Sequence, residues 1–110
     1  MGVNDIVDLV LLLDRRGGEE LEDQAGPEGI SLVEELRYLL AARMRESDMY
    51  TPLWNEFRAE PESNRAEVIG ALEAMVEGDA ALAERLEALL ENFNALALAH
   101  GSAWQPPAAE

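Results

Sequence analysis

Apolar side chains recur at helical spacing through most of this chain, and the clearest run lies between residues 80 and 97. There the leucines and a phenylalanine follow one another mostly at intervals of three and four positions, which places them on one stripe of a helix. A helix over this range is roughly 27 Å long at about 1.5 Å per residue, enough to span a small bundle. Its apolar stripe consists of Leu82, Leu86, Leu89, Leu90, Phe93 and Leu96.

Start signals predict two helices in the middle of the chain. Residues 31–34 read Ser-Leu-Val-Glu. This is a capping box, in which the serine hydroxyl accepts from the amide of the fourth residue, and it predicts a helix to about residue 45 or 46. Thr51 and Pro52 then provide a cap and a first-turn proline for a short helix over 52–59.

A further helix is predicted over residues 64–77, immediately before the long amphipathic one. Asn64 can cap its start, Gly78 closes it, and Asp79 can cap the helix that follows. Because a link as short as Gly78–Asp79 leaves little room to turn, we expect these last two helices to pair as an antiparallel hairpin.

Residues 1–16 predict an N-terminal helix that is apolar on most sides. Asn4 can cap it, and every position from Leu9 to Leu13 is apolar. A helix with so little polar face is buried in its own core or docked on a partner. A buried strand is the alternative, because periodicity alone does not assign so short a run.

The segments on either side of the central bundle have different compositions. Residues 17–30 are rich in glycine and acidic side chains, which predicts an exposed, acidic loop that acts as a hinge or a linker. Residues 101–110 predict a flexible tail, whose Trp104 either folds back on the bundle or anchors a partner. With residues 31–100 as a helical bundle, the fold class is all-α: four or five helices ending in an antiparallel helical hairpin.

Composition narrows the function classes. The chain has 110 residues, 23 of them acidic and 8 basic, for a formal net charge of −15, and it has no cysteine. A protein with this much negative charge repels phosphate backbones and anionic bilayers. We therefore expect neither direct nucleic-acid binding nor membrane association. The hydrophobic run at residues 6–13 is too short to span a bilayer and lacks a basic leader, which favours a cytoplasmic protein. Every basic residue is arginine, and we expect these side chains to pair with glutamates.

The chemistry of catalysis and of cofactor binding has no motif in this sequence. The single histidine, His100, falls at the end of the last predicted helix, where capping is its expected role. No second histidine or cysteine completes a metal site, and no Gly-rich phosphate loop or nucleophile turn occurs. We therefore expect no enzymatic activity, no cofactor and no metal.

Two clusters of side chains deserve a functional interpretation. Tyr50, Trp54 and Phe57 lie within eight residues and predict a core plug. An aromatic ligand pocket is the alternative, although the sequence shows no polar groups that converge on it. The second cluster is an acidic face at intervals of three and four positions on the last helix, which is either a solubilising face or a mimic of nucleic-acid charge. It consists of Glu84, Glu87 and Glu91.

A family resemblance rests on residues 53–57, Glu60-Pro61 and residues 78–90. These segments read LWNEF, EP and GDAALAERLEALL, and they resemble small helical effector-associated modules found beside bacterial conflict effectors. Such modules are similar in role to death-like adaptors. The resemblance covers roughly residues 50–93 and implies an adaptor that joins a sensor to an effector by helix-to-helix contact.

These observations predict a non-enzymatic protein–protein interaction module, an adaptor or assembly unit that acts through helix packing. The first helix offers more apolar surface than one small bundle needs, so self-association or a protein partner would cover it. Its expected interface residues are Leu9, Leu12 and Leu13, together with Trp104. The alternatives are an acidic nucleic-acid mimic that inhibits a basic DNA- or RNA-binding protein, and an accessory subunit of an enzyme complex.

Overall fold

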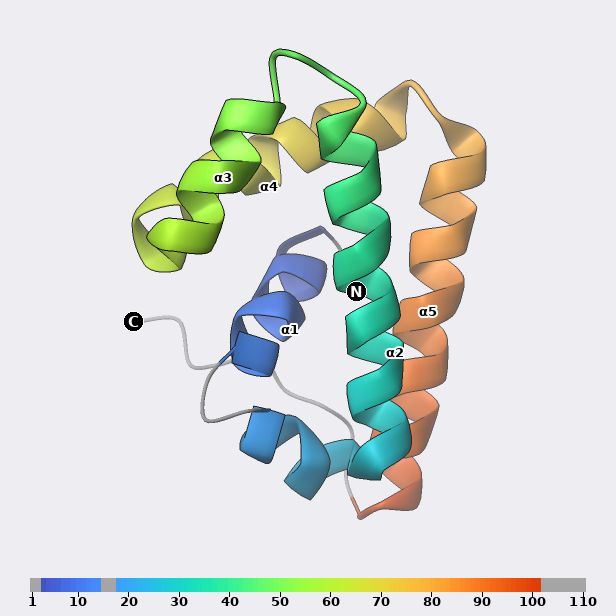
Figure 1. Ribbon diagram of the computed structural model, residues 1–110. Helices are drawn as coiled ribbons and strands as arrows, with labels where there is room; N and C mark the ends of the chain where they lie inside the picture. The colour runs from blue at the N-terminus through green and yellow to red at the C-terminus, as the bar shows by residue number, and fades with distance from the viewer. Residues whose placement is uncertain (1–2, 15–17, 102–110) are drawn as a thin grey trace.

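The computed structural model describes residues 3–14 and 18–101, and this part of the chain forms five helices without a strand (Figure 1). The prediction of a small all-α bundle is therefore confirmed. The radius of gyration is 13.4 Å and the principal extents are 41 × 29 × 25 Å. The helices are α1 (Val3–Asp14), α2 (Glu19–Arg45), α3 (Thr51–Ala59), α4 (Pro61–Glu77) and α5 (Ala80–Ala99).

The long helices α2 and α5 run antiparallel, side by side (Figure 1). Gly29 permits their close approach, because a Cβ atom built there would overlap the Cβ of Ala25 and lie 3.3 Å from Phe93 Cε1. The chain ends, as predicted, in two helices joined by the short Gly78–Asp79 link. However, α5 has its antiparallel neighbour in α2, while α4 packs mainly on α3 and α1 (Figure 1).

The apolar helix α1 packs in the core of its own chain, between α2 and α4. Leu9, Leu12 and Leu13, the expected interface residues, are all buried there. The structure thus selects one of the two alternatives for this helix, and it is a helix rather than a strand. In this conformation these three leucines present no surface to a partner.

Helix α1 is also tied to α4 by a buried ion pair. Asp8 lies on α1 with its side chain only 12% exposed, and it accepts hydrogen bonds from Arg65 Nε at 2.8 Å and Arg65 Nη2 at 3.1 Å. This bidentate geometry is the strongest form of arginine–carboxylate contact. Within residues 3–14 and 18–101, Asp8 is the one buried charged side chain.

The loop predicted over residues 17–30 is wrong from Glu19 onward, because α2 begins there and bends instead of breaking. At Gly26 the backbone has φ 74° and ψ −176°, and Pro27 starts the next turn, a position where its missing N–H costs nothing. Leu21 and Ala25, one helical turn apart, are fully buried. Their burial stabilises the short helical segment that the glycine and acidic composition concealed.

Helix starts differ from prediction in two further places. Ser31 lies inside α2, so its capping box is not used, and α4 begins at Pro61 instead of at Asn64. Asn64 Nδ2 donates to the carbonyl oxygens of Glu56 at 3.1 Å and Glu60 at 3.0 Å, which stabilises the end of α3. The predicted cap of α5 is confirmed, since Asp79 Oδ1 accepts from the backbone N–H of Leu82 at 3.0 Å.

Replacing Gly70 with alanine is expected to stabilise the fold by about 1 kcal/mol. Gly70 lies in the exposed interior of α4, where a new Cβ meets nothing within 4 Å. Alanine therefore gains the full difference in helix propensity. Urea unfolding followed by circular dichroism measures it. Gly29→Ala is the matched control and should lose stability, because its Cβ overlaps Ala25; a loss at Gly70 would contradict the prediction.

Candidate functional site

Arginine side chains reveal which charges this fold neutralises internally. Of the six arginines within the described ranges, four lie within 4.0 Å of a carboxylate. The expected partners were glutamates, but three of the five carboxylates in these pairs belong to aspartates. The pairs are Arg37 with Asp14, Arg43 with Asp79 and Glu46, Arg65 with Asp8, and Arg85 with Glu35.

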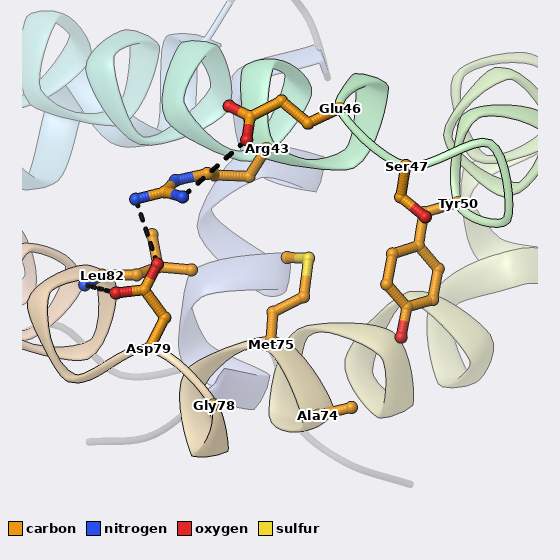
Figure 2. Close-up of a pocket in the computed structure, with 9 residues that line it drawn as sticks. All are labelled: Arg43, Glu46, Ser47, Tyr50, Ala74, Met75, Gly78, Asp79 and Leu82. Carbon is orange, nitrogen blue, oxygen red and sulfur yellow. Dashed lines mark hydrogen bonds and ion pairs between the residues drawn. The ribbon is translucent and has the colours of Figure 1, made fainter.

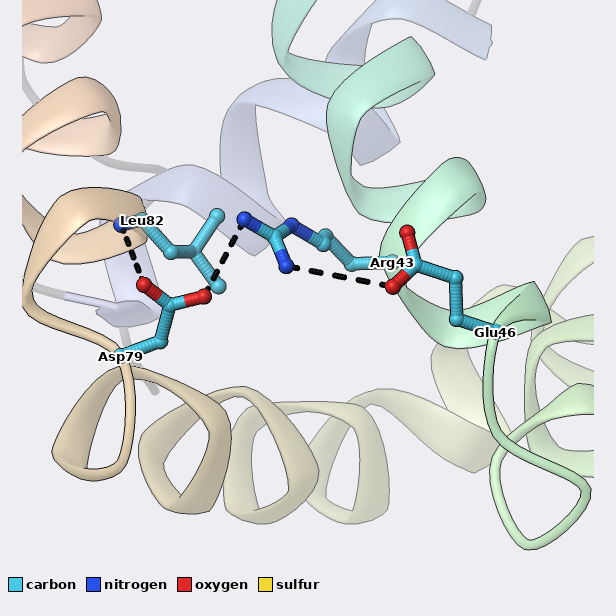
Figure 3. A network of polar contacts seen from close by, with 4 residues as sticks. All are labelled: Arg43, Glu46, Asp79 and Leu82. Carbon is cyan, nitrogen blue, oxygen red and sulfur yellow. Dashed lines mark hydrogen bonds and ion pairs between the residues drawn. The ribbon is translucent and has the colours of Figure 1, made fainter.

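A small pocket at the corner where α4 meets α5 illustrates such neutralisation. Figure 2 shows Arg43 reaching between Glu46 and Asp79, with Tyr50 and Met75 lining the other side of a cavity of about 380 Å³. The Arg43–Asp79 distance is 3.1 Å and the Arg43–Glu46 distance 3.9 Å, and Asp79 also caps α5 (Figure 3). Each of these charged side chains lies near one of opposite sign, so the contacts at this corner connect α2 with the start of α5.

A second cavity, of about 540 Å³, lies among α1, α2, α3 and the start of α4. We call it the arginine cleft, after the three arginines in its lining. Arg37 and Arg45 come from the last turns of α2, and Arg58 from the end of α3. Aromatic residues supply much of the remaining wall: Tyr38, Trp54 and Phe57.

Charge in the arginine cleft is only partly compensated. Arg37 Nη1 lies 2.6 Å from Asp14 Oδ1, so that charge has a partner. Arg45 and Arg58, in contrast, form no ion pair with any carboxylate of residues 3–14 and 18–101. Trp54 is buried, and its indole Nε1 has no hydrogen-bond acceptor in the part of the chain that the structure describes.

A third cavity, also about 540 Å³, lies between α2 and α5. Its apolar lining comes from Leu32, Ala95 and Leu96, and its edge on α2 carries Glu28 and Glu35. We call it the acidic groove. Glu35 is held by Arg85 at 2.8 Å, and both side chains are exposed, so this contact is weak and can open.

The residues singled out from sequence lie elsewhere. Leu9, Leu12 and Leu13 are in the core, while Trp104 is outside the described residues. The acidic face is exposed on α5, as predicted, without lining either cavity; its members are Glu84, Glu87 and Glu91.

Two further structural findings bear on function. None of the helices that the structure describes is long and apolar enough to cross a membrane. His100 caps the end of α5, where its backbone N–H donates to the carbonyl oxygens of Leu96 and Ala97 at 3.1 Å. The predicted position of His100 at the end of this helix is confirmed, and the capping bonds come from its backbone N–H.

Comparison of the chain with protein-family models, with curated proteins and with solved structures gave no match. The assignment of function therefore rests on the side chains of this chain and the cavities they line.

Proposed function

We propose that this protein is a non-enzymatic interaction module whose acidic groove receives a basic amphipathic helix of a partner protein. The observation that carries the proposal is a groove with an apolar floor, edged by Glu28 and Glu35, in a chain of net charge −15. An amphipathic helix docks in this way when its apolar face enters the groove and its cationic residues meet the acidic edge.

The surface beside the groove fits the same occupant. By helical spacing, Glu91 and Leu98 share a side of α5 with Ala95, which lines the groove. Glu91 is exposed, and Leu98 is 56% exposed, so they extend both the acidic edge and the apolar floor. The large net negative charge also attracts a basic partner at a distance and accelerates its association.

The nucleic-acid mimic and the family resemblance both relate directly to this proposal. An acidic nucleic-acid mimic would also bind a basic protein, but through charge alone, whereas the groove adds an apolar floor. The resemblance of residues 50–93 to effector-associated adaptor modules supports a role in joining two proteins. Because the apolar residues of α1 are buried in the core, we assign that role to the exposed α2–α5 surface.

Two alanine-to-arginine variants of the protein test the groove. The probe is a synthetic helical peptide with leucines on one face and lysines on the other. Ala95→Arg places bulk and positive charge in the groove, and we expect it to weaken binding by about tenfold or more. Ala66→Arg is the matched control, since Ala66 is exposed on α4 and lies outside the groove. Fluorescence anisotropy of labelled peptide gives both affinities.

Ionic strength separates the groove from simple charge attraction. A peptide seated on the apolar floor should keep much of its affinity at about 1 M salt, where the Debye length is only about 3 Å. Equal losses for Ala95→Arg and Ala66→Arg, or complete release at high salt, would contradict the proposal and favour the nucleic-acid mimic.

A further inference from the structure

The arginine cleft holds positive charge that the fold itself does not use. Arg45 and Arg58 are the two arginines of the described ranges without a carboxylate partner, and both line this one cavity. They come from different helices, the ends of α2 and α3. Three arginines and two carboxylates, Asp14 and Glu34, line this cavity. Its lining therefore carries a formal charge of 3 − 2 = +1 in a chain of net charge −15, and this local positive charge favours an anionic ligand.

The walls of the cleft indicate what that anion carries. Trp54 and Phe57 pack with ring centroids 5.5 Å apart and form a buried aromatic wall. Tyr38 also lines the cavity and is 77% exposed, an unusual exposure for so large an aromatic side chain. Aromatic faces of this kind bind flat or bulky apolar groups, and arginine and tyrosine at an exposed site are typical of recognition surfaces.

Trp54, one of the lining residues, also has an unused hydrogen-bond donor. Its Nε1 is buried without an acceptor in the described part of the chain, and a buried donor of this kind is destabilising until an acceptor reaches it. A ligand that brings oxygen atoms into the cavity offers acceptors for donors of this kind. The cavity volume of about 540 Å³ falls within the range of about 300–1,000 Å³ usual for small-molecule sites.

We propose that the arginine cleft binds a small organic acid whose carboxylate is attached to an aromatic or bulky apolar body. The planar guanidinium groups of Arg45 and Arg58 hold the carboxylate, because arginine and carboxylate match in bidentate geometry. The body lies against Tyr38 and the Trp54–Phe57 wall. The site is separate from the acidic groove and does not depend on the proposed function.

Four probes test the ligand class on the whole chain. Naphthoate carries both features, and naphthamide keeps the apolar body without the charge. Inorganic phosphate is an anion without an apolar body, and glycylglycylphenylalanine presents a carboxylate and an aromatic ring as a peptide C-terminus does. Binding is followed by the NMR shift of the Trp54 indole N–H in isotope-labelled Trp104→Phe protein, which retains one tryptophan. We expect naphthoate to shift this signal, to bind at least about tenfold more tightly than naphthamide and phosphate, and to bind no more weakly than the peptide.

Matched variants locate the site. Arg45→Gln and Arg58→Gln should each weaken naphthoate binding, and the double variant should abolish it. Arg85→Gln removes the same charge from α5, outside the cleft, and should leave binding unchanged. All three side chains are exposed, and thermal melts confirm that each variant folds.

Each contrary result overturns a stated part of the proposal. Equal binding of naphthamide excludes carboxylate recognition, and equal binding of phosphate excludes the apolar body. Tighter binding of the peptide replaces the free acid with a protein C-terminus. No shift with naphthoate, or an equal loss in Arg85→Gln, removes the site altogether. None of these outcomes bears on the acidic groove, whose test uses a different probe and different variants.

Discussion

Replacing Arg65 with methionine is expected to destabilise the protein by about 3 kcal/mol, because it leaves the Asp8 carboxylate in the core without its partner. Asp8 lies on α1 with a side chain only 12% exposed, and both of its oxygens accept from Arg65. Methionine keeps the apolar stem of arginine, so the loss reports mainly on the charge. Urea unfolding of the variant and the parent protein measures the difference.

The two partners of this ion pair should respond unequally. Arg65 is 38% exposed and can turn to water, so Asp8→Leu should cost less than Arg65→Met. The double variant should be more stable than Arg65→Met alone, since it contains no buried unpaired charge. The order of stability among these variants separates the cost of a buried, unpaired carboxylate from the cost of losing the contact between α1 and α4.

Arg85→Met provides the control for this experiment. The Arg85–Glu35 pair has a similar distance, 2.8 Å, but both of its side chains are about half exposed. Pairs of this kind contribute about 0–1 kcal/mol. If Arg65→Met costs no more than Arg85→Met, then the burial of Asp8 is not what makes the α1–α4 contact important.

Local signals in the sequence were sufficient for most of the helices. The leucine spacing predicted α5, and Asp79 is its cap, as predicted. Thr51–Pro52 correctly located the start of α3, but Thr51 is the first residue of this helix and not its cap, because the N-cap position falls on Tyr50. These signals act within one or two turns of the chain, so they need no knowledge of the fold. The all-α class and the predicted count of four or five helices follow from them.

The arrangement of the helices depends on contacts between distant residues. In the pairing of α2 with α5, Gly29 lies close to Phe93, which is 64 positions further along the chain. The start of α2 was missed because Leu21 and Ala25 are too few to show a period, and only burial by the rest of the fold makes them significant. Glycine and proline composition favoured a loop for the same segment.

The candidate sites were less accessible to sequence reasoning than the helices. The aromatic cluster that includes Trp54 and Phe57 was recognised from the sequence as a core plug. A ligand pocket was only the alternative, because the sequence showed no polar groups that converge on these side chains. The fold supplies them: Arg45 and Arg58 lie at the ends of two different helices and meet at one cavity. The acidic groove was hidden because Glu28, one of its edges, fell in the segment predicted to be a loop.

Replacing Gly26 with alanine is expected to cost about 2 kcal/mol, through a larger backbone effect and a smaller steric one. The backbone there has φ 74° and ψ −176°, a region that side chains with a Cβ essentially do not adopt, at a cost of about 1–3 kcal/mol. The new Cβ would also lie 2.8 Å from His100 Nε2 and 2.9 Å from His100 Cε1, so the imidazole must move. Thermal and urea unfolding report the sum.

Removing the imidazole separates the two effects. His100→Ala in the Gly26→Ala background relieves only the steric contact, so we expect partial recovery of stability, with the backbone cost remaining. Full recovery would mean that the bend in α2 tolerates a side chain and that the kink is set by the packing of α5's end. No recovery would mean that the backbone conformation alone requires glycine. In that case Gly26 sets the bend within α2 independently of its contact with His100.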